Sequence, residues 1–121
     1  MSIAAAQAEK FYSQIVKEKR VFTFTNDGEY LVFPISGYEV VPFWSSLSRM
    51  KTTQKNHEKY QKHKITELSL TEFMEDIFEL LEGEKIHIGI NWSGKKLVGY
   101  DCTVSDVKKN LMYRLEAGKN G

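Results

Sequence analysis

The sequence predicts an α+β fold: a single domain with a mixed, mostly antiparallel sheet and helices on one face, in the order α-β-β-β-α-β-α-β-β-α. The chain has 121 residues, a usual length for one domain. Apolar residues recur at helical spacing in some segments and alternate in others, as half-buried strands do. Hairpins and helices are segregated along the chain, which favours α+β. We therefore expect residues 1–121 to form one domain, with its core between about 4 and 116.

The first predicted element is a helix over about 4–19. Ser2 is its expected N-cap, and Phe11 and Ile15 lie on its apolar face. The sequence then switches to an alternating pattern, which predicts three strands of an antiparallel meander. These strands are expected near 21–25, 30–33 and 38–41.

Two turns connect the strands of this meander. Asn26-Asp27-Gly28 and Ser36-Gly37 are predicted to form them, because Asn, Asp and Gly tolerate the positive φ of tight hairpins. Pro34 and Pro42 are expected to end the second and third strands, since proline has no backbone N–H to donate.

A short helix is expected next, capped by Ser45 or Ser46. The residues that it turns inward are Leu47 and Met50. The following stretch, 51–64, is nearly all polar, and Tyr60 is its sizeable apolar residue. We expect 51–64 to be exposed and more mobile than the rest, because it lacks the apolar contacts that offset an ordering entropy of about 1–2 kcal/mol per residue.

A strand over 65–68 is predicted to lead into a third helix near 70–82. Ser69 and Glu72 have the spacing of a capping box at its start, and Gly83 is expected to end it. Its predicted apolar stripe comprises Leu70, Phe73, Met74, Ile77, Leu80 and Leu81.

The last elements are strands near 86–91 and 97–100, joined by a turn at Ser93-Gly94, and a helix near 104–116. Thr103 and Asp106 form a second capping box, and Gly118 is expected to stop the helix. The helix is expected to turn inward Val104, Val107, Leu111, Met112 and Leu115. Across the whole chain we expect burial of Phe11, Ile15, Phe73, Ile77, Leu81, Ile88, Ile90, Val107 and Leu111.

Composition limits the classes of function. The net charge of +1 gives no argument for nucleic acid or an acidic membrane as a partner. Cys102 is the single cysteine, so neither a disulfide framework nor a cysteine-based metal cluster is expected. No run approaches 18 apolar residues, and the first residues do not resemble a signal peptide. We expect a soluble, cytoplasmic protein, monomeric or weakly dimeric, that needs no cofactor and binds neither nucleic acid nor a membrane.

No motif predicts catalysis. The segment Gly89-Ile-Asn-Trp-Ser-Gly94-Lys95-Lys96 matches a phosphate-binding loop except at Lys96, which has no hydroxyl for magnesium, and a strand rather than a helix follows it. His57, His63 and His87 lack metal-ligand spacing. Cys102 precedes a helix, which can activate a thiol, but such a cysteine is more often a packing residue. We predict no catalytic residues and no metal site.

The charged residues are unevenly distributed. Residues 49–64 hold six Lys or Arg and one Glu, whereas 67–84 hold seven acidic residues and no basic one. These two segments either complement each other within the fold or form surfaces that bind a partner protein. The basic segment has Tyr60 as its one aromatic residue, so it offers no stacking platform for single-stranded nucleic acid.

Three segments are distinctive: Pro42-Phe43-Trp44-Ser45 before a short helix, the helix start at Leu68 to Phe73, and the strand Ile88-Gly89-Ile90-Asn91. With these segments, and over roughly residues 5–115, the chain resembles a family of small bacterial proteins known only as a domain of unknown function. The order of elements is more weakly similar to the SseB-like domain of type III secretion. The resemblance implies a bacterial, cytoplasmic α+β domain and supplies no activity. Family members more often have an alanine-rich helix where this chain has 51–64.

Two classes of function remain open. The first is a non-enzymatic binding or protein-interaction module, for example an immunity-type inhibitor, that uses the basic or the acidic surface. The second is a small-molecule or peptide-binding protein with a cleft near Trp44 and Trp92, in which Ser45 and Asn91 supply the polar groups. The alternative for these tryptophans is structural: Trp44 anchors the core and Trp92 covers a turn.

Overall fold

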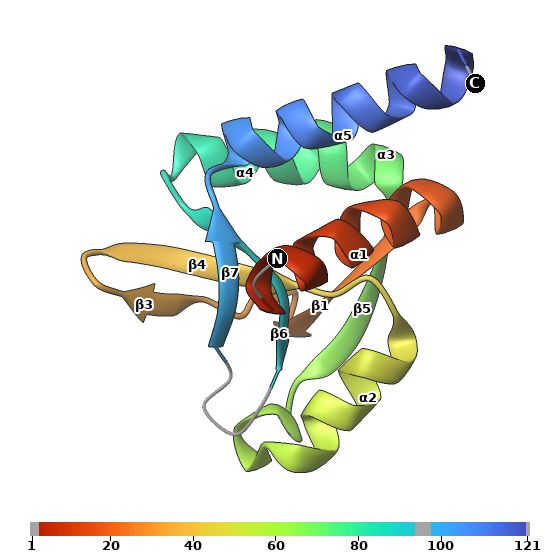
Figure 1. Cartoon of the computed structure of the whole chain (residues 1–121). Coiled ribbons are helices and arrows are strands. Elements are labelled where there is room, and N and C mark those ends of the chain that lie inside the picture. Colours follow the sequence, from red (N-terminus) through yellow and green to blue (C-terminus); the bar gives the residue numbers. More distant parts are fainter. Residues whose placement is uncertain (1–2, 94–97, 121) are drawn as a thin grey trace.

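The computed structural model describes residues 3–93 and 98–120 (Figure 1). The expected Ser2 cap, the Gly94 turn and the lysines of the loop-like motif lie outside these residues. The α+β class is confirmed, but the described strands form two sheets where the sequence predicts one. The three-stranded antiparallel sheet has the order β2 (Glu29–Tyr30), β1 (Arg20–Asn26), β5 (Lys64–Ser69). The four-stranded sheet has the order β3 (Phe33–Ile35), β4 (Tyr38–Phe43), β6 (His87–Ser93), β7 (Val98–Cys102).

The predicted meander is divided between these sheets. Its two hairpins are confirmed: β1 pairs with β2 and β3 with β4, and the turn residues Asp27, Gly28, Ser36 and Gly37 all have positive φ. The predicted strand 30–33, however, is interrupted after Tyr30, so that the chain passes from one sheet to the other.

Neither proline ends its strand. Pro34 lies within β3, which is an edge strand, and there its missing N–H is tolerated. Pro42 lies in β4 beyond Val40, the last residue that pairs with β3, and β4 continues to Phe43. On its other side β4 pairs with β6 in parallel, and β6 pairs with β7 in the antiparallel direction.

One isolated backbone bridge joins the two sheets within the described residues. Phe22 of β1 and Trp44, which follows β4, exchange two N–H···O hydrogen bonds of 2.8 Å each. The bridge holds the interior of β1 against the residue that follows β4, a short distance before the next helix.

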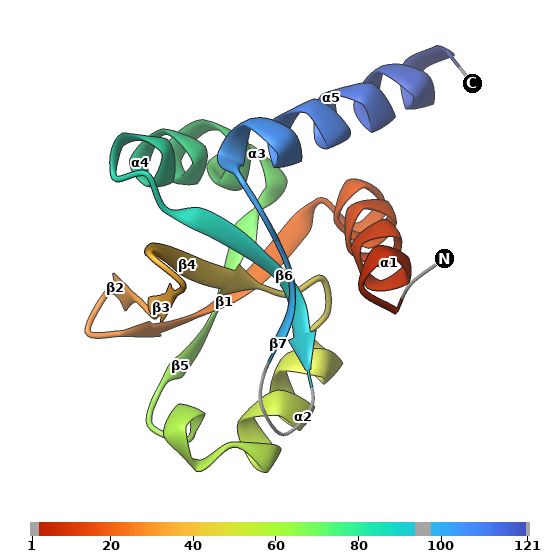
Figure 2. The ribbon, with the colours of Figure 1, turned by 60° about the vertical axis from the view of Figure 1, so that its left-hand side comes forward.

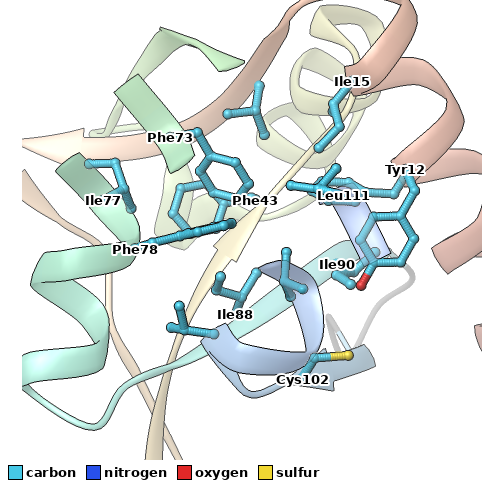
Figure 3. Close-up of a cluster of buried hydrophobic side chains, with 14 of the residues drawn as sticks. Tyr12, Ile15, Phe43, Phe73, Ile77, Phe78, Ile88, Ile90, Cys102 and Leu111 are labelled. Atoms are coloured by element: carbon cyan, nitrogen blue, oxygen red, sulfur yellow. The ribbon is translucent and has the colours of Figure 1, made fainter. Parts of the chain in front are cut away.

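The main core lies between the four-stranded sheet and three helical segments (Figures 2 and 3). These are α1 (Ile3–Glu18), the continuous segment α3 (Leu70–Glu72), η2 (Phe73–Ile77) and α4 (Phe78–Gly83), and α5 (Val104–Asn120). The predicted capping box is confirmed: Glu72 N–H donates to Ser69 Oγ at 3.0 Å, and Ser69 N–H donates to Glu72 Oε1 at 3.1 Å. All nine residues predicted for the core are buried.

The helices do not all cover one face. Helix α2 (Leu47–Asn56) and the short 3-10 helix η1 (Glu58–Tyr60) lie at the opposite end of the molecule from α4 and α5 (Figures 1 and 2). There they pack on a second cluster, which contains Phe22, Phe24, Val40, Trp44, Met50, Tyr60 and Trp92.

The expectation for 51–64 is wrong in part. Most of its described side chains are exposed, but α2 extends to Asn56, and Thr53 and Tyr60 are buried. The Tyr60 ring stacks on Phe24 at a centroid distance of 5.0 Å. The Gln54 amide donates to the carbonyls of Tyr60 and His63, at 3.1 and 2.9 Å, and so ties the segment back to α2.

Four smaller predictions are also wrong. Leu80 is 48% exposed, whereas Phe78 is buried. The reason is that η2 is a π-helix, in which successive residues are rotated by less than the 100° of an α-helix, so the residues that follow it face other directions. Met112 and Leu47 are exposed because the buried stripes of their helices pass through Leu111 and Met50. Gly118 does not stop α5, which continues to Asn120.

Candidate functional site

The site begins at an irregularity in β6. Asn91 has φ +46°, and the pairing of β6 with β7 shifts between Ile90 and Ser93, as in a β-bulge. The bend folds the Trp92 indole back over Gly89, where a Cβ atom would lie 2.6 Å from Trp92 Cε2. Gly89 is therefore required by the indole and not by a phosphate.

The structure brings Trp44 and Trp92 together. The Trp44 indole N–H donates to the Trp92 carbonyl at 2.8 Å, and the Trp92 indole N–H donates to the Tyr100 carbonyl at 3.1 Å. Both indoles are buried, with 0% and 2% exposure. Because each indole has a single N–H and both are bonded to backbone, the rings are held in fixed positions.

Ser45 and Asn91 lie beside the tryptophans, but their polar groups are bonded to each other. Ser45 N–H donates to Asn91 Oδ1 at 2.9 Å, and Asn91 Nδ2 donates to Ser45 Oγ at 3.1 Å. The Ser45 hydroxyl also donates to Gln14 Oε1 on α1. Both residues are at most 2% exposed, so this network ties together three elements of the fold.

A pocket of about 230 Å³ lies against the two indoles. We call it the indole pocket, and the residues that line it are Trp44, Ser48, Arg49, Thr52, Thr53, Trp92 and Ser93. Two of the four residues predicted for the site, Trp44 and Trp92, belong to this lining, whereas Ser45 and Asn91 lie behind it. Since the indoles are almost fully covered, they form the floor, and the mouth consists of side chains from α2 and Ser93.

The sequence prediction missed the α2 residues of this lining. Ser48, Arg49, Thr52 and Thr53 recur one helical turn apart, on one face of α2. Such polar spacing is typical of an ordinary solvated helix face, so the spacing alone gave no signal. Among the described lining residues Arg49 carries the only charge, and it makes no side-chain ion pair or hydrogen bond with another described residue.

Cys102 lies in the main core and not in the pocket. Its side chain is buried beside Tyr12, and Figure 3 shows the two side chains together. Burial raises the pKa of the thiol, and the hydroxyls of Tyr100 and Tyr12 offset this only in part. An activated thiol needs a lowered pKa, so this environment favours a packing role.

The histidines make ring contacts. The His87 ring stacks on Tyr38 at 4.2 Å, and its Nδ1 lies 3.7 Å from Asp101 Oδ1, which also accepts the Tyr38 hydroxyl at 3.0 Å. His57 and His63 both contact the Tyr60 ring. Within residues 3–93 and 98–120, no three His, Cys, Asp or Glu side chains are grouped so as to hold a metal ion.

Three further observations bear on identity. No helix in the described part of the chain has the length and hydropathy to cross a membrane. No curated protein matches the chain. Residues 8–111, however, match the family DUF2750, which is described as a protein of unknown function, and this match spans the helices and strands that build the core and the indole pocket. The chain therefore belongs to the DUF2750 family, in agreement with its expected resemblance to a domain of unknown function.

Proposed function

We propose that this protein is a non-enzymatic binding module and that the indole pocket is its ligand site. The observation that carries the proposal is a pocket of about 230 Å³ lined by two fixed indoles and by Arg49, whose side chain makes no ion pair or hydrogen bond with another described residue. A concave site with an apolar floor and a few convergent polar groups is the usual form of a small-ligand site. Its volume suits a small metabolite or one residue of a peptide.

The lining favours binding over catalysis. None of the described lining residues is a carboxylate, an imidazole or a thiol. Those are the groups that usually act as general bases or as activated nucleophiles. Hydroxyls and a guanidinium instead position a ligand by hydrogen bonds and charge.

The proposal is tested by filling the pocket. Thr52→Phe places a large ring in the lining, whereas Lys51→Phe adds the same ring at an exposed neighbouring position of α2 outside it. Ligand-detected NMR with a library of small metabolites is expected to find compounds that bind the wild type and Lys51→Phe but not Thr52→Phe. Equal binding to both variants, or no binding to the wild type, contradicts the proposal.

A second candidate is a docking surface for a basic protein. The acidic residues of the α3–α4 segment, Glu72, Glu75, Asp76, Glu79 and Glu82, are all exposed, and Leu80 among them is 48% exposed. An apolar side chain surrounded by charge is a common arrangement in protein interfaces. If this surface binds a basic protein, a partner captured from the native lysate is expected to be released by added salt, because salt screens the attraction between exposed charges.

This second candidate has a matched test. Glu75→Gln, Asp76→Asn and Glu79→Gln together are expected to abolish capture. The control variant, Glu18→Gln, Glu39→Gln and Glu116→Gln together, removes the same number of exposed acidic charges elsewhere and is expected to retain it. Capture that is equal in both variants contradicts the docking surface. The cytoplasmic and bacterial setting and the monomeric or weakly dimeric state stay predictions.

A further inference from the structure

The mouth of the indole pocket is rich in hydrogen-bond donors. Ser48, Thr52 and Ser93 are exposed hydroxyl residues, and Arg49, which lines the same pocket, is partly buried. The Arg49 guanidinium has no carboxylate partner among the described residues, and none of the described residues that line the pocket is acidic. A ligand with an anionic oxygen pair balances its charge, since the planar N–H groups of arginine match such a pair in a bidentate way.

The floor of the pocket has the opposite character. The single N–H of Trp44 is bonded to the Trp92 carbonyl, and that of Trp92 to the Tyr100 carbonyl. The indoles therefore present carbon, and no free donor, to whatever occupies the innermost part of the pocket. A ligand that fits both ends has an anionic head at the mouth and an apolar body toward the floor.

We infer that the ligand of the indole pocket is a small monocarboxylate, an inference that rests on the proposed binding function. Carboxylate is favoured over phosphate because Arg49 supplies one unit of positive charge, and the other described polar side chains of the lining are neutral hydroxyls. One guanidinium balances a singly charged carboxylate but leaves much of a phosphate dianion uncompensated. The volume corresponds to roughly eight water-sized groups, at about 30 Å³ each.

The inference is tested with matched acid and amide pairs, which have nearly the same shape and differ in charge. The probes are propionate against propionamide and benzoate against benzamide, with inorganic phosphate as a separate arm. The chain has two tryptophans, and both belong to the floor, so their indole N–H signals in a ¹H–¹⁵N NMR spectrum report on the pocket alone. We expect saturable shifts of these signals with at least one acid, and at least tenfold weaker binding of the matching amide, because hydrogen bonds to charged groups are worth about one order of magnitude or more.

Variants of α2 separate Arg49 from general charge. Arg49→Gln is expected to lose at least tenfold in affinity for the acid and much less for the amide, whose neutral carbonyl makes the weaker hydrogen bond. Arg49→Lys keeps the charge without the planar donor pair and is expected to retain part of the affinity. Lys51→Gln removes one positive charge from the same helix outside the lining and is expected to bind like the wild type.

The outcomes distinguish this inference from the function on which it rests. If acids and amides bind equally well, or if Arg49→Gln and Lys51→Gln lose affinity alike, the carboxylate assignment is overturned while the pocket remains a binding site. Tighter binding of inorganic phosphate than of either acid overturns the assignment as well. If metabolite screening finds no compound whose binding Thr52→Phe removes, the binding function itself fails.

Discussion

The indole of Trp92 packs so closely over Gly89 that a Cβ atom there would lie 2.6 Å from Trp92 Cε2. The irregularity at Asn91 bends β6, which lies between β4 and β7, and the bend brings the ring of Trp92 over Gly89. The contact holds the Trp92 carbonyl where it accepts the Trp44 indole N–H. Gly89 thus determines the position of the pocket floor.

Gly89→Ala is therefore expected to lower the free energy of unfolding by about 1–3 kcal/mol, the usual effect of forcing extra atoms into a packed core. Urea denaturation followed by tryptophan fluorescence measures it. Gly83→Ala is the control, because nothing lies within 4 Å of a Cβ atom there. It is expected to be neutral or to stabilise by up to about 1 kcal/mol, since alanine is the better helix former. A Gly89→Ala variant as stable as the wild type contradicts the prediction.

Asn91 combines a left-handed backbone with a buried side-chain network, and two substitutions separate these roles. Asn91→Gly removes the amide that bonds Ser45 but tolerates φ +46°, and a loss of about 1–3 kcal/mol is expected from the unpaired buried groups. Asn91→Ala removes the same amide and adds backbone strain of about 1–2 kcal/mol. Thermal unfolding is expected to rank the proteins wild type, glycine variant, alanine variant. The reverse order of the two variants would show that the backbone conformation is not decisive.

The π-helix η2 exchanges the buried and exposed residues that the sequence pattern predicts for this segment. Phe78 is 3% exposed and its ring lies 4.8 Å from that of Phe73, whereas Leu80 is 48% exposed. Phe78→Ala is expected to cost about 3–5 kcal/mol, and Leu80→Ala less than about 1 kcal/mol. Chemical denaturation of both variants tests the register. A larger loss in Leu80→Ala would mean that the helix packs without the wide turn.

The buried phenol of Tyr60 is expected to make the free energy of unfolding fall at alkaline pH. Burial raises the pKa of its phenol above the ordinary value of 10.0. The unfolded chain therefore loses this proton at a lower pH than the folded protein does. The corresponding stability is fully present below about pH 10 and is lost as the pH rises from there toward the folded pKa. In Tyr60→Phe, the free energy of unfolding is expected to decline less steeply above pH 10 than in the wild type. Tyr113→Phe, at a residue 77% exposed, is expected to keep the wild-type slope, and an equal slope in all three proteins would refute the assignment.

The sequence alone located features that depend on near neighbours. The capping box at Ser69 and Glu72, the tight turns at Asp27-Gly28 and Ser36-Gly37, and the nine core residues are all confirmed. Each is encoded within a few residues, because caps, turn dihedrals and amphipathic stripes are short-range properties. For Trp44 and Trp92 the sequence left two alternatives open, a shared cleft or two separate structural roles, because local patterns do not determine whether two strand ends meet. It did not find Arg49, because one arginine on a polar helix face has no distinguishing pattern.

Only the tertiary structure decided how the strands are divided and joined. The bridge between Phe22 and Trp44, the antiparallel pairing of β1 with β5 and the parallel pairing of β4 with β6 each connect segments that are far apart in the sequence. Which strands pair depends on which pairings bury both apolar clusters at once. The alternating pattern of a strand does not identify its partner, because the pattern is the same whichever strand lies beside it. The wide turn of η2 also depends on elements that are distant in the sequence. It determines which side chains of the segment face the sheet, and packing against those elements selects it. The amino-acid pattern thus determined which elements form and which faces they bury, whereas the global competition for burial determined their partners, their register and the pocket between them.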